Sequence, residues 1–375
     1  MQVVTGSALL RSEVFPGVDV RGQEHLVIIA KSTWSLPAPG QRARPIESAP
    51  FACADEHHGE PGLSALRRAH DMARFKPQCD IVFDACAHAP DGQPVSALAV
   101  QARVGEWSKR IKVWGQRTWK RVLMSYEPSK PEPFVRMPLH LGLAFGGTRS
   151  HGQGSKKEDG KQDELAEAYA ANPVGIGWAG PHTIGQAGGQ PMPCLEDFED
   201  PVKHPDGHHR PIALSAIGAN VPERARHAGT YDAAWRKNVF PFLPEDFDER
   251  FFQSAPPDQR IAYPKGGEEV ELIHLLAGQP HLKFKLPALN QLQVRVLRKD
   301  YSIEVPAVHP DTLFLETEAR RFSVVWRASV PIRRHIQEFN TIAVGPIDEQ
   351  WWRARSLGLD ESGCVGCGQA AQSAV

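Results

Sequence analysis

The residues with the strongest chemical pattern are Cys364 and Cys367, which form Cys-Val-Gly-Cys near the end of the chain. Two cysteines at this spacing supply half of a tetrahedral zinc site, or a redox-active pair. A zinc site needs two further ligands, and Cys79 and Cys86 are separated by six residues, more than such a site normally has. The small polar residues around the motif predict neither the strand nor the helix of a redox fold. We therefore expect residues 356–375 to form a flexible tail, with a zinc or redox site as the alternative.

The histidines that could bind a metal ion occur as two adjacent pairs with acidic residues nearby: His57–His58, His208–His209, Glu60, Asp71 and Asp206. Adjacent side chains rarely converge on one ion. His204 and His208 have a spacing that would place both on one face of a helix. However, Pro205 and Gly207 lie between them and disfavour a helix. We therefore expect exposed loop histidines and no metal ligands, with a metal site as the alternative.

Acidic residues form two clusters that could supply catalytic carboxylates: Glu196, Asp197, Glu199 and Asp200, and then Glu245, Asp246, Asp248 and Glu249. In glycoside hydrolysis two carboxyl groups face each other across a cleft, which spacing along the chain does not establish. The sequence contains no Gly-x-Ser-x-Gly motif. Solvated acids are the simpler interpretation, and Pro244 followed by two acids is typical of the start of a helix.

Three glycines, Gly175, Gly177 and Gly180, have the spacing of a dinucleotide-binding motif. Such a site also needs a strand before the motif and a helix that begins within it. Pro173 and Pro181 enclose the motif and no helical pattern follows, so we expect turns. Together, these patterns predict no catalytic residue, no cofactor-binding residue, no metal ligand and no cofactor.

The composition favours a soluble, β-rich protein. Of 375 residues, 41% are hydrophobic, which is enough for a core, and 32 prolines with 32 glycines favour strands and turns. A net charge of −1 carries no electrostatic signature of nucleic-acid binding. The first residues lack a signal-peptide pattern, and no apolar run has the length of a membrane span. We therefore expect a cytoplasmic protein that binds neither nucleic acid nor membrane.

Apolar runs with partial alternation predict strands at residues 25–36, 81–83, 97–104, 110–114, 270–276, 281–286, 292–297, 312–316 and 322–332. Short helices are expected at 64–75 and 164–171. The expected fold class is mainly β (β-rich α+β), with antiparallel sheets in two β-sandwich-like parts, an irregular aromatic and proline-rich middle, and few short helices. The sequence leaves open whether these are two lobes or one sandwich closed by both halves.

A polar segment from Thr148 to Asp163 contains no large apolar residue. We therefore expect an N-terminal β-rich part at 1–147, a mobile insertion at 148–171 and a C-terminal part at 172–355, followed by the tail.

Basic residues gather around one predicted strand, close to three tryptophans: Lys109, Arg110, Lys112, Arg117, Lys120 and Arg121, with Trp107, Trp114 and Trp119. They could form a ligand or nucleic-acid face. A solvated strand face backed by buried tryptophans is the simpler interpretation.

The segment Gly229–Gln259 combines many aromatic rings with four prolines. Rings of this size cannot all remain exposed, so they pack into the protein or against a partner. We favour an internal clamp between the β-rich parts, because internal packing removes apolar area from water without a partner. In the alternative, some rings bind a partner, with Phe251 and Phe252 the first to do so. The candidate partner-binding residues are Trp235, Phe240, Phe242, Phe247, Phe251 and Phe252.

Seven blocks follow one another along the chain: HLVIIAKSTWSL, DACAHAPDGQPVSALAVQARVGEWSKRIKVWGQRTWK, PFVRMPLHLGLAFGG, NPVGIGW, MPCLEDFEDPV, GTYDAAWRKNVFPFLPEDFDERFFQSAPPDQR and GGEEVELIHLL. In this order they resemble the bacterial family known as domain of unknown function 2169, whose members occur with type VI secretion systems. The resemblance covers roughly residues 20 to 350. The segment Thr148–Asp163 and the cysteine-containing tail lie outside the best-matching blocks.

The resemblance implies an accessory role. Such proteins look like adaptors or chaperones that hold a toxic effector and help to load it onto the secretion spike, which consists of a trimeric tube protein and a PAAR-type tip. The family has no established catalytic residues, so none is transferred. We therefore expect a non-enzymatic protein whose partners are a type VI secretion effector and a PAAR or spike protein.

Two alternatives remain open. The first is a hydrolase in which at least two of Glu196, Asp197, His208 and His209 converge in a deep pocket. The second is a structural component of the secretion apparatus.

Overall fold

The structure is a computed structural model that describes residues 1–156 and 162–359. It is mainly β, with several mostly antiparallel sheets, and the described residues form three short α-helices: α1 (Pro222–Ala225), α2 (Ala233–Asn238) and α3 (Glu349–Ser356). This confirms the predicted mainly β class with antiparallel sheets and few short helices. Single 3-10 turns occur at Pro90–Gly92, Leu141–Leu143, Ile184–Gln186, Glu249–Phe252, Pro257–Gln259 and Ile336–Glu338. Within the same described ranges, none of the helices combines the length and the apolar character needed to cross a membrane.

The largest sheet has seven strands in the order β19-β7-β24-β25-β3-β2, with β4 paired to β3: β2 (Leu10–Val18), β3 (Glu24–Ser35), β4 (Pro45–Ile46), β7 (Cys79–Asp84), β19 (Arg260–Ile261), β24 (His309–Glu316) and β25 (Arg321–Pro331). All its pairs are antiparallel except β24 with β7. Along β25, Phe322, Val324 and Trp326 lie in the apolar core. The intervening residues point to the other face, as strand geometry requires, and there Arg327 is buried as well.

A second sheet has five antiparallel strands in the order β18-β10-β9-β20-β21: β9 (Ala97–Val104), β10 (Trp107–Trp114), β18 (Leu195–Glu196), β20 (Glu269–Ile273) and β21 (His281–Lys285). Its inward residues, among them Val100, Ile111 and Val270, share one apolar core with Ile28 and Ile81 of the first sheet. Both sheets contain strands from before residue 147 and after residue 172. The strand pairing therefore follows the alternative in which both halves close common sheets.

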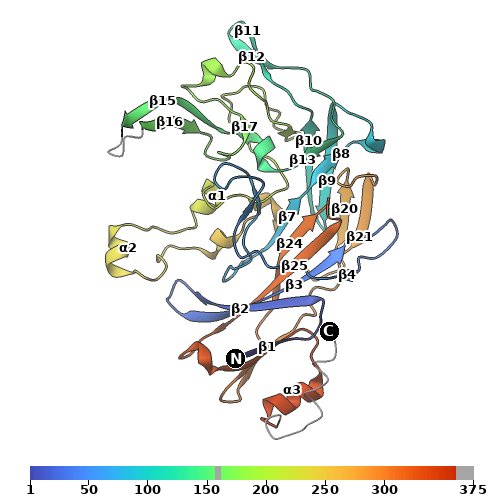
Figure 1. Cartoon of the computed structure of the whole chain (residues 1–375), viewed down its shortest axis with the longest axis vertical. Coiled ribbons are helices and arrows are strands. Elements are labelled where there is room, and N and C mark those ends of the chain that lie inside the picture. The colour runs from blue at the N-terminus through green and yellow to red at the C-terminus, as the bar shows by residue number, and fades with distance from the viewer. Residues whose placement is uncertain (157–161, 360–375) are drawn as a thin grey trace.

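A four-stranded sheet lies at the end of the molecule that carries the N-terminus (Figure 1), in the order β1-β26-β22-β23: β1 (Gln2–Thr5), β22 (Val294–Arg298), β23 (Ile303–Glu304) and β26 (Phe339–Val344). Helix α3 covers it, because Trp352 packs on Leu297 and Ala343.

The remaining strands form two-stranded pairs: β5 (Glu56–His57) with β6 (Leu66–Arg68), β8 (Cys86–His88) with β13 (Arg136–Pro138), β11 (Trp119–Val122) with β12 (Ser125–Pro128), β14 (Phe145–Gly146) with β17 (Ile176–Gly177), and β15 (Thr148–Lys156) with β16 (Gln162–Ala168). The β11–β12 hairpin lies at the opposite end from β1 and α3, and α2 and the β15–β16 hairpin extend from one side (Figure 1).

Both helices expected from the sequence are wrong. Residues 64–75 contain β6 and irregular chain, because Arg67 binds Glu56, Asp84 and Glu316 and thereby fixes this segment in an extended path. Residues 164–171 begin as strand β16, which pairs with β15 across the predicted insertion. In both places long-range pairing outweighs a weak local helix preference.

Candidate partner-binding surface

The aromatic stretch contains a loop whose two ends are joined. Thr230 donates from its backbone N–H and its hydroxyl to the carboxylate of Asp246, at 2.9 and 2.7 Å. These hydrogen bonds lower the pKa of Asp246. Residues 230–246 therefore form a closed loop, which we call the aromatic loop.

Helix α2 forms the outer part of the aromatic loop and extends away from the sheets (Figure 1). It begins at Asp232, whose side chain accepts the N–H of Trp235 at 2.8 Å, as a helix N-cap does. The helix ends within six residues, and Pro241 follows shortly afterwards. The cap therefore places Trp235 in the first turn of a short helix at the outer part of the aromatic loop.

The rings of the aromatic loop pack on one another and remain open to solvent. Trp235 contacts Tyr231 and Phe240 edge to face, with ring centroids 4.7 and 5.7 Å apart. The exposed fractions are 52% for Tyr231, 66% for Phe240 and 49% for Phe242. Contiguous exposed rings of this kind are typical of an interaction site.

Phe242 connects the aromatic loop to the rest of the protein. Its ring lies over the turn between β2 and β3, where a Cβ on Gly22 would come within 3.3 Å of it. Gly22 has φ +76°, a conformation that favours glycine. The loop is thus held in place by contacts that leave its outer rings uncovered.

The three remaining candidate rings pack internally. Phe247 is buried, Phe251 and Phe252 are partly buried, and the three contact each other edge to face at 5.7–6.0 Å. Arg224 lies 5.4 Å from the Phe251 ring centroid and donates to the Phe251 carbonyl. In the alternative in which some rings bind a partner, the sequence named Phe251 and Phe252 first. Phe240 and Phe242 are the more exposed rings, because the closed loop carries them outward.

Gln259 connects the two large sheets by side-chain hydrogen bonds. Its side-chain amide donates to the carbonyl of Ile81 in β7 at 2.8 Å and to that of Leu214 at 3.0 Å. Its oxygen accepts from Lys109 of β10 at 2.7 Å. Because Gln259 is fully buried, these hydrogen bonds are protected from water. Sequence reasoning missed this residue, since a single glutamine has no pattern.

A cavity of about 440 Å³ lies beside this connection, lined mainly by apolar residues together with His208, His209, Arg210, Glu223 and Asp258. His209 binds the carboxylate of Asp200 through Nδ1 at 2.8 Å. Of the four residues predicted for a hydrolase, the two histidines line this cavity. The acids lie elsewhere: Glu196 is buried beside Arg117 and Trp114, and Asp197 accepts the N–H of Glu199.

Two of the six basic residues predicted for the strand face are buried in ion pairs. Arg117 pairs with Glu196 at 2.6 Å, and Lys109 is buried beside Asp258 at 3.0 Å. Burial lowers the pKa of Lys109 to about 8, although Asp258 opposes this shift. Of the three tryptophans near this face, Trp119 is fully buried, and Trp107 and Trp114 are partly buried.

Within residues 1–156 and 162–359, none of the histidines, acids and cysteines predicted as metal candidates belongs to a group of three or more whose ligand atoms converge. Cys79, Cys86 and Cys194 are buried free thiols, and burial raises the pKa of Cys86 to about 12 and that of Cys194 to about 11. His58 stacks on His140 at 4.3 Å. Cys364 and Cys367 lie outside the described residues.

The glycines of the dinucleotide-like motif allow close backbone packing. Gly177 lies in β17 with φ +93°, and a Cβ there would come within 2.4 Å of Pro193. A side chain at this position would therefore disrupt the contact.

Comparison with known proteins gives one result. Residues 21–327 match the family model described as an uncharacterized protein conserved in bacteria, domain of unknown function 2169. The chain gives no match among curated proteins and none among solved structures. Because the family model covers most of its length, the chain belongs to this bacterial family, domain of unknown function 2169.

Proposed function

We propose that this protein is a non-enzymatic adaptor, or chaperone, that holds a type VI secretion effector and assists its loading onto the PAAR and spike complex. The observation that carries the proposal is the aromatic loop, with Tyr231, Phe240 and Phe242 about half or more exposed. Large rings in an exposed cluster are the residues that dominate the free energy of protein–protein binding.

The aromatic loop is organised before a partner binds. Asp246 closes its base, and the Trp235 indole donates to the Phe242 carbonyl at 3.0 Å. A loop that is already ordered loses little conformational entropy on binding, so more of the contact energy contributes to affinity. Exposed Arg236 and Lys237 on α2 add positive charge beside the rings, which favours an acidic rim on the client.

The test is co-expression with the toxin and the PAAR protein encoded beside this gene, followed by size-exclusion chromatography and titration of the purified partners. The double variant Tyr231→Ala/Phe240→Ala should bind the client at least about tenfold more weakly at unchanged melting temperature. Phe198→Ala is the matched control, because Phe198 is 41% exposed but lies outside the aromatic loop, beside Arg110. Equal affinity of the double variant and the wild type would contradict the proposed surface.

A second candidate function, hydrolysis, is favoured by the cavity that His208 and His209 line. The Asp200 carboxylate orients the His209 ring, as in histidines that act as general bases. Hydrolytic activity that Asp200→Asn and His209→Ala both abolish would support it, and activity unaffected by both variants would exclude this cavity as the site.

A further inference from the structure

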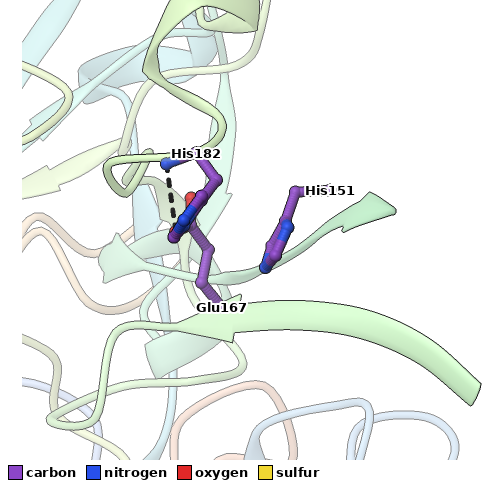
Figure 2. A group of neighbouring side chains, drawn as sticks. All are labelled: His151, Glu167 and His182. Atoms are coloured by element: carbon purple, nitrogen blue, oxygen red, sulfur yellow. Dashed lines mark hydrogen bonds and ion pairs between the residues drawn. The ribbon is translucent and has the colours of Figure 1, made fainter. Parts of the chain in front are cut away.

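Three side chains from separate segments meet where the β15–β16 hairpin contacts the loop at residues 180–183. They are His151 of β15, Glu167 of β16 and His182 of the loop (Figure 2). One nitrogen or oxygen atom of each lies within 4.8 Å of those of the other two. The sequence did not single out any of the three, because they are far apart along the chain and share no motif.

A β-bulge directs His151 towards the other two side chains. Ser150 pairs with Ala166 and Gly152 pairs with Leu165, so His151 is the extra residue of the hairpin. A bulge turns the side chain of its extra residue out of the regular alternation, and such bulges are frequent beside functional sites. The His151 ring consequently lies parallel to the His182 ring, with centroids 4.4 Å apart (Figure 2).

The carboxylate of Glu167 is held in one orientation. The hydroxyl of Thr183 donates to Oε1, and the N–H of His182 donates to Oε2 at 3.3 Å. Gly180 leaves the space for this carboxylate, since a Cβ there would come within 2.5 Å of Glu167. Oε2 then faces Nδ1 of His182 at 3.1 Å.

We propose that His151, Glu167 and His182 bind one divalent transition-metal ion of the zinc class, with the fourth position open to water or to a donor group of a partner. Zinc bonds of about 2.0–2.2 Å place neighbouring ligand atoms about 3–3.5 Å apart, close to the separation of Glu167 and His182. Two imidazoles with one carboxylate favour zinc over calcium or magnesium, which prefer oxygen ligands alone.

Binding of the ion requires one histidine ring to rotate. An ion lies in the plane of each imidazole that binds it. The two ring planes are 15° from parallel, so the His151 ring must rotate while Glu167 and His182 stay in place.

Arg149 lies opposite Glu167 in the register of the β15–β16 hairpin and donates to the Trp178 carbonyl. Its positive charge opposes the ion, so the site is weaker than a closed structural zinc site.

The ion would connect the β15–β16 hairpin to the loop at 180–183. This role is independent of the aromatic loop, and the inference does not rest on the proposed function.

The experiment uses the full-length, tag-free chain with Cys364→Ser/Cys367→Ser, because the tail motif is a rival zinc ligand. After treatment with a chelator and its removal, the protein is titrated with Zn²⁺ by calorimetry and with Co²⁺ by visible absorption. We expect one ion per chain and a higher melting temperature with zinc. We expect zinc binding to be at least about tenfold weaker in His151→Ala, Glu167→Gln and His182→Ala. We expect it to be about tenfold weaker in Thr183→Ala and Gly180→Ala, because both changes disturb the orientation of the Glu167 carboxylate.

His281→Ala is the matched control, because His281 also contacts a carboxylate, Glu271 at 2.7 Å, on another part of the surface. It should leave zinc binding unchanged, and circular dichroism checks that every variant is folded. The proposal is overturned if the tail-substituted chain takes up no ion, or if the folded His151, Glu167 and His182 variants bind zinc as well as their parent.

Discussion

The indole Nε1 of Trp235 donates a hydrogen bond to the backbone carbonyl of Phe242, 3.0 Å away, and this bond spans the outer part of the aromatic loop. It joins α2 to the turn that follows Pro241. Because the Phe242 ring is 49% exposed and Trp235 is only partly buried, the bond contributes to the order of the loop more than to the stability of the whole protein.

Trp235→Phe removes the N–H donor and keeps an aromatic ring. We expect the free energy of unfolding to change by less than about 1 kcal/mol. Trypsin should cleave faster after Arg236 or Lys237, which are exposed on α2, because the loop opens more often. The measurements are limited proteolysis under native conditions and urea denaturation. A cleavage rate equal to that of the wild type would show that this bond does not order the loop.

Arg327 and Asp311 form a buried ion pair at 2.6 Å, with side chains 3% and 1% exposed. Arg327→Ala leaves the Asp311 carboxylate buried without its partner, so we expect the free energy of unfolding to fall by about 3–5 kcal/mol. The double variant Arg327→Ala/Asp311→Ala should lose less than the sum of the two single variants.

The matched control for that pair is Arg226→Ala, which breaks the exposed pair with Glu223 and should cost less than about 1 kcal/mol. Urea denaturation measures the four variants and the wild type. A loss below about 1 kcal/mol for Arg327→Ala would contradict the assignment of this pair to the core.

His140 should make stability depend on pH. Burial lowers the pKa of His140 from 6.5 to about 4, with a further contribution from His58. Between these two values the unfolded chain binds a proton that the folded chain does not, so the free energy of unfolding falls as the pH falls from about 6.5 to 4. The loss contributed by this residue is up to about 3 kcal/mol.

Denaturation of the wild type and His140→Gln at a series of pH values measures this effect. His140→Gln should flatten the dependence on pH, while His204→Gln, at an exposed position, should leave it unchanged. An identical slope for wild type and His140→Gln would assign the dependence to other groups.

Leu123 occupies the turn of the β11–β12 hairpin with φ +53° and is 90% exposed. A leucine in this left-handed conformation is strained, and glycine is not. Leu123→Gly should therefore raise the free energy of unfolding by about 0.5–1 kcal/mol. Met124→Gly at the neighbouring position, whose φ is not positive, should give no such gain. Thermal denaturation distinguishes the two, and a lower melting temperature for Leu123→Gly would show that the leucine side chain stabilises the turn.

The sequence by itself determined the β-rich class and most strands of the two large sheets. Strand β9 coincides with its predicted range, and β3 and β25 are displaced by one residue at each end. In these strands apolar residues alternate with polar ones, or follow one another over several residues. The first pattern is typical of a strand with one buried face and the second of a strand buried on both faces. The sequence also identified the aromatic stretch, because rings and prolines at that density are visible in the composition.

The tertiary structure decided which chain segments become neighbours. Alternation shows that a residue points inward but not which strand lies opposite, so the sequence could not place Ile81 and Ile111 in one core. It also could not separate Phe240, carried outward by the closed loop, from Phe252, which packs on Phe247.

The same reason applies to the proposed metal site. His151, Glu167 and His182 become neighbours through a bulge and a tight turn, and long-range contacts of this kind leave no periodic trace in the sequence. Local patterns therefore determined most strands of the two large sheets, and the packing between elements determined the candidate sites.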